Sequence, residues 1–124
     1  MNHNSKTLSR RTFAGGVAAA GVSALSAAEQ QARRKTFVFV HGTWHGGWVW
    51  RDVRRDLAGR GHDVFTPSCT GCGDRKHLMS PDIGLDTHIT DITNLIEYEE
   101  LQDVILVGHS FAGLTITLSS AYRW

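Results

Sequence analysis

The sequence predicts an α/β fold built on a parallel sheet, because short apolar runs alternate along the chain with segments of helical periodicity. Three runs rich in β-branched and aromatic residues are typical of strands: 37–40, 63–67 and 104–107. The segments 48–60 and 87–100 repeat apolar residues at helical spacing. Strands joined through helices pack as right-handed crossovers, which makes the sheet parallel.

The first half of this pattern begins with a strand that is buried on both faces. Residues 37–40 are all apolar and precede a glycine-rich stretch, which is typical of a central parallel strand. The helix 48–60 should end at Gly61, because glycine commonly follows the last helical turn. The second strand, 63–67, ends at its proline, which cannot donate a ladder hydrogen bond.

The second half begins with a long connection. Residues 68–86 are expected to form a loop whose length suggests a function or flexibility. The helix 87–100 follows, with isoleucine and leucine on one face. The third strand, 104–107, then leads through a turn into a helix that starts at about Phe111.

The turn after the third strand carries a candidate nucleophile, Ser110. A strained strand-to-helix turn that presents a serine needs small residues two positions before and two positions after it. Gly108 and Ala112 meet this need, although the strict pattern has glycine in place of Ala112. The sequence therefore predicts that Ser110 is the catalytic residue of a hydrolytic site.

A glycine-rich loop, 41–48, follows the first strand. Such a loop can turn backbone N–H groups toward a ligand, and one of these groups completes the oxyanion hole in serine hydrolases of this plan. Because the carboxyl ends of parallel strands share one edge, this loop and Ser110 should meet at one site. The expected oxyanion-hole donors are the backbone N–H groups of Thr43 and Phe111.

With these motifs the chain resembles the α/β-hydrolase fold, and within it the small esterases akin to plant methylesterases and their bacterial relatives. The stretches that carry the resemblance are 41–50, 70–77, 80–81 and 84–89, and it runs from about residue 36 to about residue 119. It implies that the first strand lies between the other two and that the crossover helices cover opposite faces. Ligands bind at such a switch point.

The resemblance implies a carboxylic-ester hydrolase in which Ser110 attacks a small-molecule ester and forms an acyl-enzyme, without cofactor or metal. In this fold the acid and the histidine of the triad follow the serine. Residues 111–124 contain no Asp, Glu or His. We therefore expect residues 33–124 to be the amino-terminal part of such a domain, truncated after the helix that follows Ser110, and inactive as such.

Two alternatives to hydrolysis stay open at this point. A non-catalytic pseudoenzyme that binds a small ligand agrees with the missing histidine. A hydroxynitrile lyase has the same fold, but these lyases usually carry threonine where this chain has Gly42, which favours hydrolysis. Histidines of the glycine-rich loop are interpreted as structural, and His109 should point away from the serine hydroxyl. The others are expected in surface or loop positions: His62, His77 and His88.

Charge and cysteine content exclude or weaken other classes. The chain has 13 basic and 12 acidic side chains and no basic stripe with interleaved aromatics, so nucleic-acid binding is unsupported. Cys69 and Cys72 have C-x-x-C spacing, but a zinc site would need a second pair. An oxidising compartment would permit a disulfide between them.

Residues 1–32 are expected to be a twin-arginine signal peptide and a linker. Arg10 and Arg11 precede an uncharged stretch rich in alanine and glycine, 12–28, and small residues at 26–28 offer a cleavage site. A membrane anchor would need ~20 strongly apolar residues, and this stretch is shorter and diluted by glycine. The protein should therefore meet the twin-arginine export machinery and be periplasmic or secreted.

Substitution of both arginines by lysine should abolish this export, because the twin-arginine machinery reads the arginine pair. The measurement is the location of a folded reporter fused to residues 1–32, with and without Arg10→Lys and Arg11→Lys. Unchanged transport of the double variant would contradict the assignment.

Overall fold

The computed structural model describes residues 25–122 and contains a three-stranded parallel sheet. Its strands are β1 (Thr36–Val40), β2 (Asp63–Phe65) and β3 (Val104–Gly108), in the order β2-β1-β3. The register pairs the end of β1 with the end of β3, Val40 opposite Gly108. The expected α/β fold with a parallel sheet and a central first strand is confirmed.

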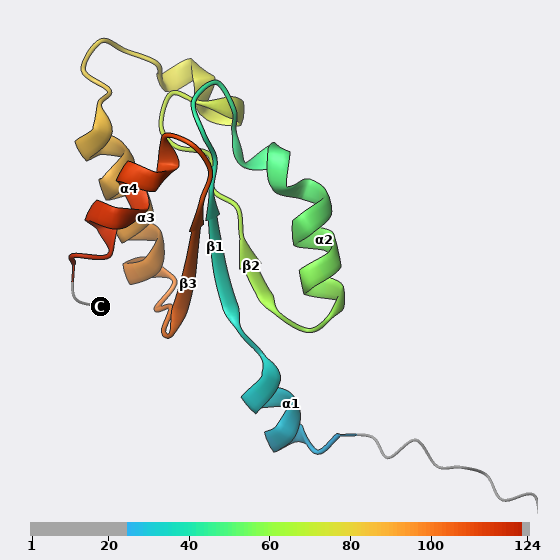
Figure 1. Cartoon of the computed structure of the whole chain (residues 1–124). Helices are drawn as coiled ribbons and strands as arrows, with labels where there is room; N and C mark the ends of the chain where they lie inside the picture. The colour runs from blue at the N-terminus through green and yellow to red at the C-terminus, as the bar shows by residue number, and fades with distance from the viewer. Residues whose placement is uncertain (1–24, 123–124) are drawn as a thin grey trace, which may run out of the picture.

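The helices cover both faces of this sheet (Figure 1). The helices that do so are α2 (Arg51–Gly59), α3 (Leu85–Tyr98) and α4 (Ala112–Ser119), whereas α1 (Ala27–Arg33) precedes the sheet and covers neither face. Helix α2 lies on one side of the strands, and α3 and α4 pack together on the other. The crossover from β1 to β2 and the crossover from β2 past β1 to β3 therefore run in opposite directions and place α2 and α3 on opposite faces, as expected.

The core lies between the sheet and the α3–α4 side. Alternate residues of β1, Val38 and Val40, are buried there with Ile92 and Ile96 of α3. The intervening Phe39 is also buried, and its ring centroid lies 5.0 Å from that of Trp50 on the α2 side. Burial on both faces explains why β1 is a continuous apolar run.

The entry to α2 differs from the single helix expected over 48–60. A separate 3-10 turn, η1 (Gly47–Trp50), precedes the α-helix. The Gly47 N–H donates to Ser68 Oγ at 2.8 Å, so the first turn is tied to the loop after β2. A 3-10 turn is the tighter winding that a helix commonly adopts at such a restrained end.

Other boundaries also shift. Strand β2 ends at Phe65, two residues earlier than expected, because Pro67 lacks the N–H of a longer ladder. The expected loop 68–86 contains a 3-10 segment, η2 (Gly73–Leu78), and ends where α3 begins at Leu85. These differences leave the order of the elements unchanged.

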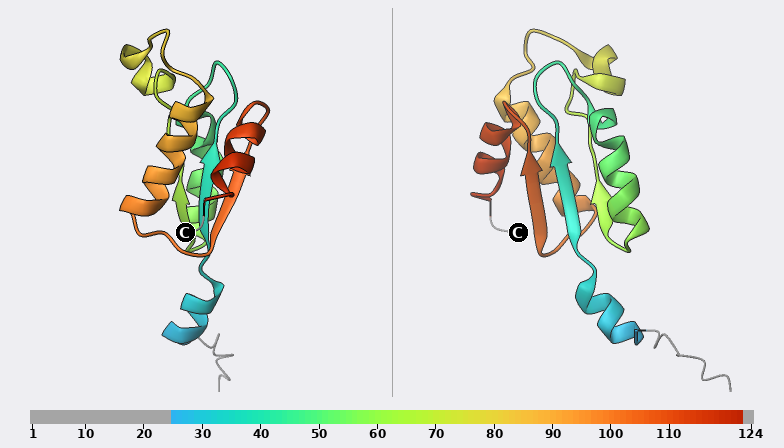
Figure 2. Two further views of the ribbon diagram at one scale, coloured as in Figure 1. Left: turned by 90° about the vertical axis from the view of Figure 1, so that its left-hand side faces the viewer. Right: turned by 45° about the vertical axis from the view of Figure 1, so that its right-hand side comes forward.

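Helix α1 was not expected from the sequence. Ser26 Oγ accepts a hydrogen bond from the Glu29 N–H at 3.2 Å, and the Glu29 carboxylate accepts one from the Ser26 N–H at 2.8 Å. This capping box starts the helix, which lies beyond the amino-terminal end of β1, away from the glycine-rich loop (Figure 2). Arg10 and Arg11 lie outside the described residues. Within residues 25–122, no helix combines the length and apolar character that a membrane crossing requires.

Gly47→Ala should destabilise the protein, because an added Cβ would lie 1.9 Å from the Thr66 carbonyl oxygen. Relieving such a backbone clash should cost about 2 kcal/mol or more of unfolding free energy. The control is Gly59→Ala, whose Cβ would meet nothing within 4 Å, and which should stabilise the helix by ~0.5–1 kcal/mol. Denaturant unfolding of the full-length gene product measures both, and equal stability of the two variants would contradict the packing.

Candidate active site

A cavity of about 560 Å³ lies where the loops after the three strands meet. Segments after β1 and after β2 form two of its walls, and Phe111 and Thr115 close it from the β3–α4 side. Thr43 and Phe111 therefore face the same space. Ser110 is not among the lining residues but lies beside one of them, Gly42. The remaining lining side chains come from 76–83 and from α3: Lys76, Met79, Ile83 and His88.

Ser110 sits in the turn between β3 and α4 with a strained backbone. Its φ is 56°, in the left-handed region that non-glycine residues rarely adopt. A Cβ on Gly108 would lie 3.0 Å from the carbonyl group of Ala112, so a larger residue at 108 would force the turn open. The exposed Ser110 side chain is thus held on a sharp strand-to-helix turn with a small residue two positions before it.

The loop after β1 packs directly against this turn. A Cβ on Gly42 would lie 3.1 Å from Ser110 Cβ and 3.0 Å from His109 Nδ1. The His109 N–H donates to the Val40 carbonyl at 3.1 Å, which extends the β1–β3 ladder to the residue before the serine. Only glycine at position 42 allows this approach without displacement.

Two backbone donors beside the cavity have no acceptor within residues 25–122. The His45 N–H donates to the Gly42 carbonyl at 3.3 Å, which closes a turn and leaves Thr43 at its second position. Phe111 immediately precedes α4, where N–H groups have no intrahelical acceptor. Among the residues described, neither the Thr43 N–H nor the Phe111 N–H has an acceptor. Both are available to a bound oxygen atom.

His41 is buried and both of its ring nitrogens bind backbone groups. Nδ1–H donates to the Gly42 carbonyl at 2.8 Å, and Nε2 accepts from the Cys69 N–H at 3.0 Å. Burial lowers the pKa of His41, and the hydrogen bond to Gly42 opposes this shift in part. A neutral ring is required, because a protonated Nε2 could not accept from Cys69. The imidazole therefore joins the loop after β1 (residues 41–46, the first loop) to the loop after β2 (residues 66–72, the second loop).

His45 and Trp44 occupy the outer part of the first loop. The His45 Nδ1 is buried, and within the described chain it has no hydrogen-bond partner. Its ring lies 6.0 Å from Trp48 and 6.1 Å from His109. Trp44 is 91% exposed at the cavity rim, so a large aromatic surface is open to a ligand there.

The loops after β1 and β2 meet backbone to backbone. A Cβ on Gly46 would lie 2.6 Å from Gly73 Cα, so neither position accepts a side chain. Cys69 and Cys72 lie in this second loop as free thiols. Burial raises the pKa of Cys69 to about 12 and also raises that of Cys72, so both thiols are protonated at neutral pH. Within residues 25–122, no group of three or more His, Cys, Asp or Glu side chains could hold a metal ion.

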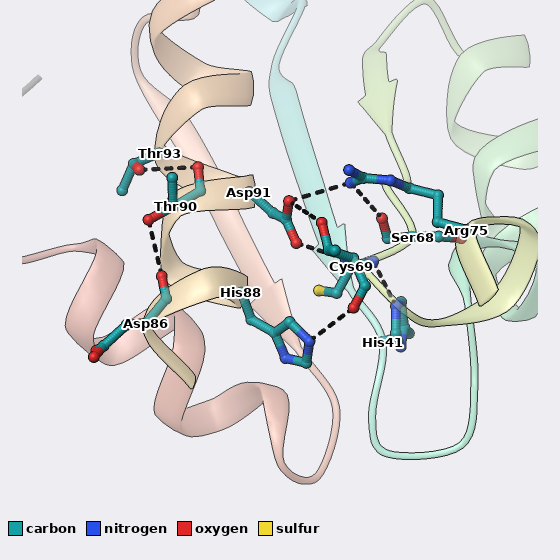
Figure 3. A network of polar contacts seen from close by, with 10 residues as sticks. His41, Ser68, Cys69, Arg75, Asp86, His88, Thr90, Asp91 and Thr93 are labelled. Carbon is teal, nitrogen blue, oxygen red and sulfur yellow. Dashed lines mark hydrogen bonds and ion pairs between the residues drawn. The ribbon is translucent and has the colours of Figure 1, made fainter. Parts of the chain in front are cut away.

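The expectation that His88 is a surface or loop residue is wrong. His88 belongs to α3, is half-buried, lines the cavity and donates from Nε2 to the Thr70 carbonyl at 3.2 Å (Figure 3). His62 is also half-buried, because its ring packs edge-on against Phe37, whereas His77 is exposed. His88 and Asp91 are three residues apart in α3, so both lie on the face that meets the loop after β2. This spacing was the pattern in the sequence that indicates a polar stripe, formed by His88 and Asp91.

Asp91 is the anchor of that stripe and was not singled out from the sequence. Its carboxylate accepts hydrogen bonds from the Thr70 N–H at 2.6 Å and from Thr70 Oγ1 at 2.7 Å. Arg75 adds an ion pair at 3.2 Å and also donates to the Ser68 carbonyl. The second loop is thereby bound to α3 (Figure 3).

Comparisons with known proteins agree with this geometry. The model of the alpha/beta hydrolase family matches residues 37–123. The chain is 56% identical over 81 residues to the carbendazim hydrolyzing esterase of Nocardioides sp. (strain SG-4G), covering 65% of this chain and 34% of that protein. It is 33% identical over 101 residues to methylesterase 2 of Arabidopsis thaliana, covering 73% and 35%.

A solved structure gives the same result. An extracellular alpha/beta-hydrolase from a Paenibacillus species superposes with a TM-score of 0.63 at 32% identity, over 69% of this chain and 34% of that one. The chain thus spans about a third of the length of the relatives that it matches. Because the family match covers β1 to α4, which hold the cavity, the chain belongs to the alpha/beta hydrolase family.

Proposed function

We propose that the protein is a carboxylic-ester hydrolase with Ser110 as its nucleophile. The observation that carries the proposal is the strained φ of 56° at Ser110, beside Gly42 and the cavity. Strain of this kind persists where the surrounding structure holds it for a function. The names of two relatives, a carbendazim hydrolyzing esterase and a methylesterase, support ester hydrolysis as the reaction class.

In the proposed reaction, Ser110 Oγ attacks the ester carbonyl carbon while a general base removes its proton. The carbonyl oxygen becomes an oxyanion, which the unpaired N–H groups of Thr43 and Phe111 stabilise. Collapse of the tetrahedral intermediate breaks the bond to the alcohol oxygen, which takes the proton from the protonated base and leaves as the alcohol, so that an acyl-enzyme remains on Ser110. Water then attacks this ester, releases the acid and restores the hydroxyl.

The general base is proposed to lie outside the described residues. Within residues 25–122, no histidine is hydrogen-bonded to the Ser110 hydroxyl. His41 uses both ring nitrogens on backbone groups, and the His109 ring packs between His45 and Trp50. We therefore also propose that the 124-residue chain on its own does not turn over an ester.

The position of Gly42 supports hydrolysis over cyanohydrin chemistry. The threonine that hydroxynitrile lyases of this fold usually carry there would place its Cβ 3.1 Å from Ser110 Cβ. Such a contact would require the loop or Ser110 to shift by a few tenths of an ångström. The absence, within residues 25–122, of a histidine bonded to Ser110 also agrees with a non-catalytic protein that binds a small ligand, whereas the strained serine turn favours an enzyme. Export through residues 1–32 remains a proposal that rests on the sequence.

Ser110→Ala should abolish covalent labelling of the full-length gene product by a fluorophosphonate probe, because the alanine has no oxygen to attack phosphorus. Labelling is read by gel fluorescence and by mass spectrometry of the labelled peptide. The matched control is Ser120→Ala. Ser120 is an exposed serine directly after α4, and its alanine variant should be labelled as the wild type is. Persistent labelling of Ser110→Ala would move the nucleophile to another residue.

The 124-residue chain alone should hydrolyse p-nitrophenyl acetate no faster than its own Ser110→Ala variant. Loss of the histidine base from a well-studied serine protease lowers turnover by about 10⁶, so the contribution of Ser110 should fall below detection. Circular dichroism of the same sample records whether the chain is folded. Ser110-dependent turnover by this chain would show that a base within it reaches the serine.

A further inference from the structure

Hydrogen bonds, together with the backbone between Thr70 and Cys69, connect α3 to the loop that carries Thr43. Figure 3 shows the part of this connection between Asp91 and His41. The connection begins at the Asp91 carboxylate, whose side chain is only 12% exposed. Both polar hydrogens of Thr70 bind this carboxylate, at 2.6 and 2.7 Å. Hydrogen bonds to an ionised acceptor are about twice as strong as neutral ones, so these two bonds hold Thr70 firmly against α3.

Cys69, which precedes Thr70 in the sequence, makes the next connection. The Cys69 N–H donates to His41 Nε2 at 3.0 Å, and His41 Nδ1–H donates to the Gly42 carbonyl at 2.8 Å. Gly42 is bonded covalently to Thr43, the proposed oxyanion donor. Asp91 thus acts on Thr43 through Thr70, Cys69 and His41, while it is itself absent from the residues that line the cavity.

Two further bonds hold the same segment from other sides. His88 Nε2–H donates to the Thr70 carbonyl at 3.2 Å, so all polar groups of Thr70 are occupied by α3. Arg75 links the Asp91 carboxylate to the Ser68 carbonyl at 3.2 Å. The segment 68–70 is therefore held on both of its ends by one carboxylate and its cation.

We propose that Asp91 is a positioning residue for ester hydrolysis: it sets the place of the Thr43 N–H through the Thr70–Cys69–His41 chain. This inference rests on the proposed function of Ser110. Oxyanion donors stabilise a transition state only when they lie about 2.7–3.1 Å from the developing charge. A displacement of about 1 Å by a residue far from the chemistry can lower the rate by about 10²-fold.

In the full-length gene product, Asp91→Asn should therefore lower kcat for ester hydrolysis more than it raises KM. The amide keeps the size of the side chain and one acceptor oxygen, but it loses the charge and faces one of the two Thr70 donors with an NH₂ group. We expect kcat to fall about 10- to 100-fold, with KM within about twofold, because the lost interaction is made in the transition state. The matched control is Glu97→Gln, an exposed carboxylate-to-amide change on the same helix.

A second pair of variants decides the question if Asp91→Asn unfolds. Thr70→Val removes the hydroxyl that binds Asp91 and keeps the shape, whereas Thr70→Ser keeps the hydroxyl. Thr70→Val should lower kcat and Thr70→Ser should restore it. A structural readout without activity is the Thr43 amide resonance, which should shift in Asp91→Asn or Thr70→Val and not in Glu97→Gln.

The outcomes separate the two proposals. If Ser110→Ala abolishes hydrolysis, but kcat and the Thr43 resonance are unchanged in the Asp91 or Thr70→Val variants, the positioning role is overturned. Equal losses in Thr70→Val and Thr70→Ser would overturn it as well. If hydrolysis survives Ser110→Ala while the Thr43 resonance still shifts, the proposed function fails and the coupling to Asp91 stands.

Discussion

The register between β1 and β3 is the constraint on which the site depends. Val40 pairs with Gly108 at the ends of the two strands, so residues that follow each strand at the same offset come to lie side by side. Gly42 is two residues beyond Val40, and Ser110 is two residues beyond Gly108. A slip of one residue would reverse the faces of β3 and would separate Ser110 from the loop that carries Thr43.

The loops after β1 and β2 carry glycine at the positions where their backbones approach a neighbouring segment closely. Gly46 against Gly73 leaves no volume for a Cβ, and a Cβ on Gly42 would contact Ser110 and His109 at 3.0–3.1 Å, closer than an ordinary contact. Glycine has no side chain to pack against neighbours, so these loop segments depend on hydrogen bonds to their backbone polar groups. Three polar side chains supply them: His41, Ser68 and Asp91. The cavity walls are therefore held by hydrogen bonds and remain open on the ligand side.

Elements that depend on apolar packing could be predicted from the sequence, whereas loop contacts that depend on distant hydrogen bonds could not. Strands and helices follow from apolar periodicity, and the order β2-β1-β3 followed once the family resemblance was seen. The 3-10 turn at Gly47 and the burial of His88 depend on hydrogen bonds to residues 21 and 18 positions away, which no local pattern records. Helix α1 was missed although Ser26 and Glu29 have capping-box spacing, because the small residues beside them suggested a cleavage site.

A carboxylate anchor suits a wall of this kind better than an apolar one would. An apolar side chain on α3 at position 91 could fill space beside Thr70, but it would leave the partly buried Thr70 N–H and hydroxyl without this acceptor, at up to about 1–3 kcal/mol for each group. Asp91 satisfies both, and Arg75 balances its charge. These bonds hold a loop of small residues in one orientation. A backbone N–H that stabilises an oxyanion needs such a fixed position, and glycine residues alone do not provide it.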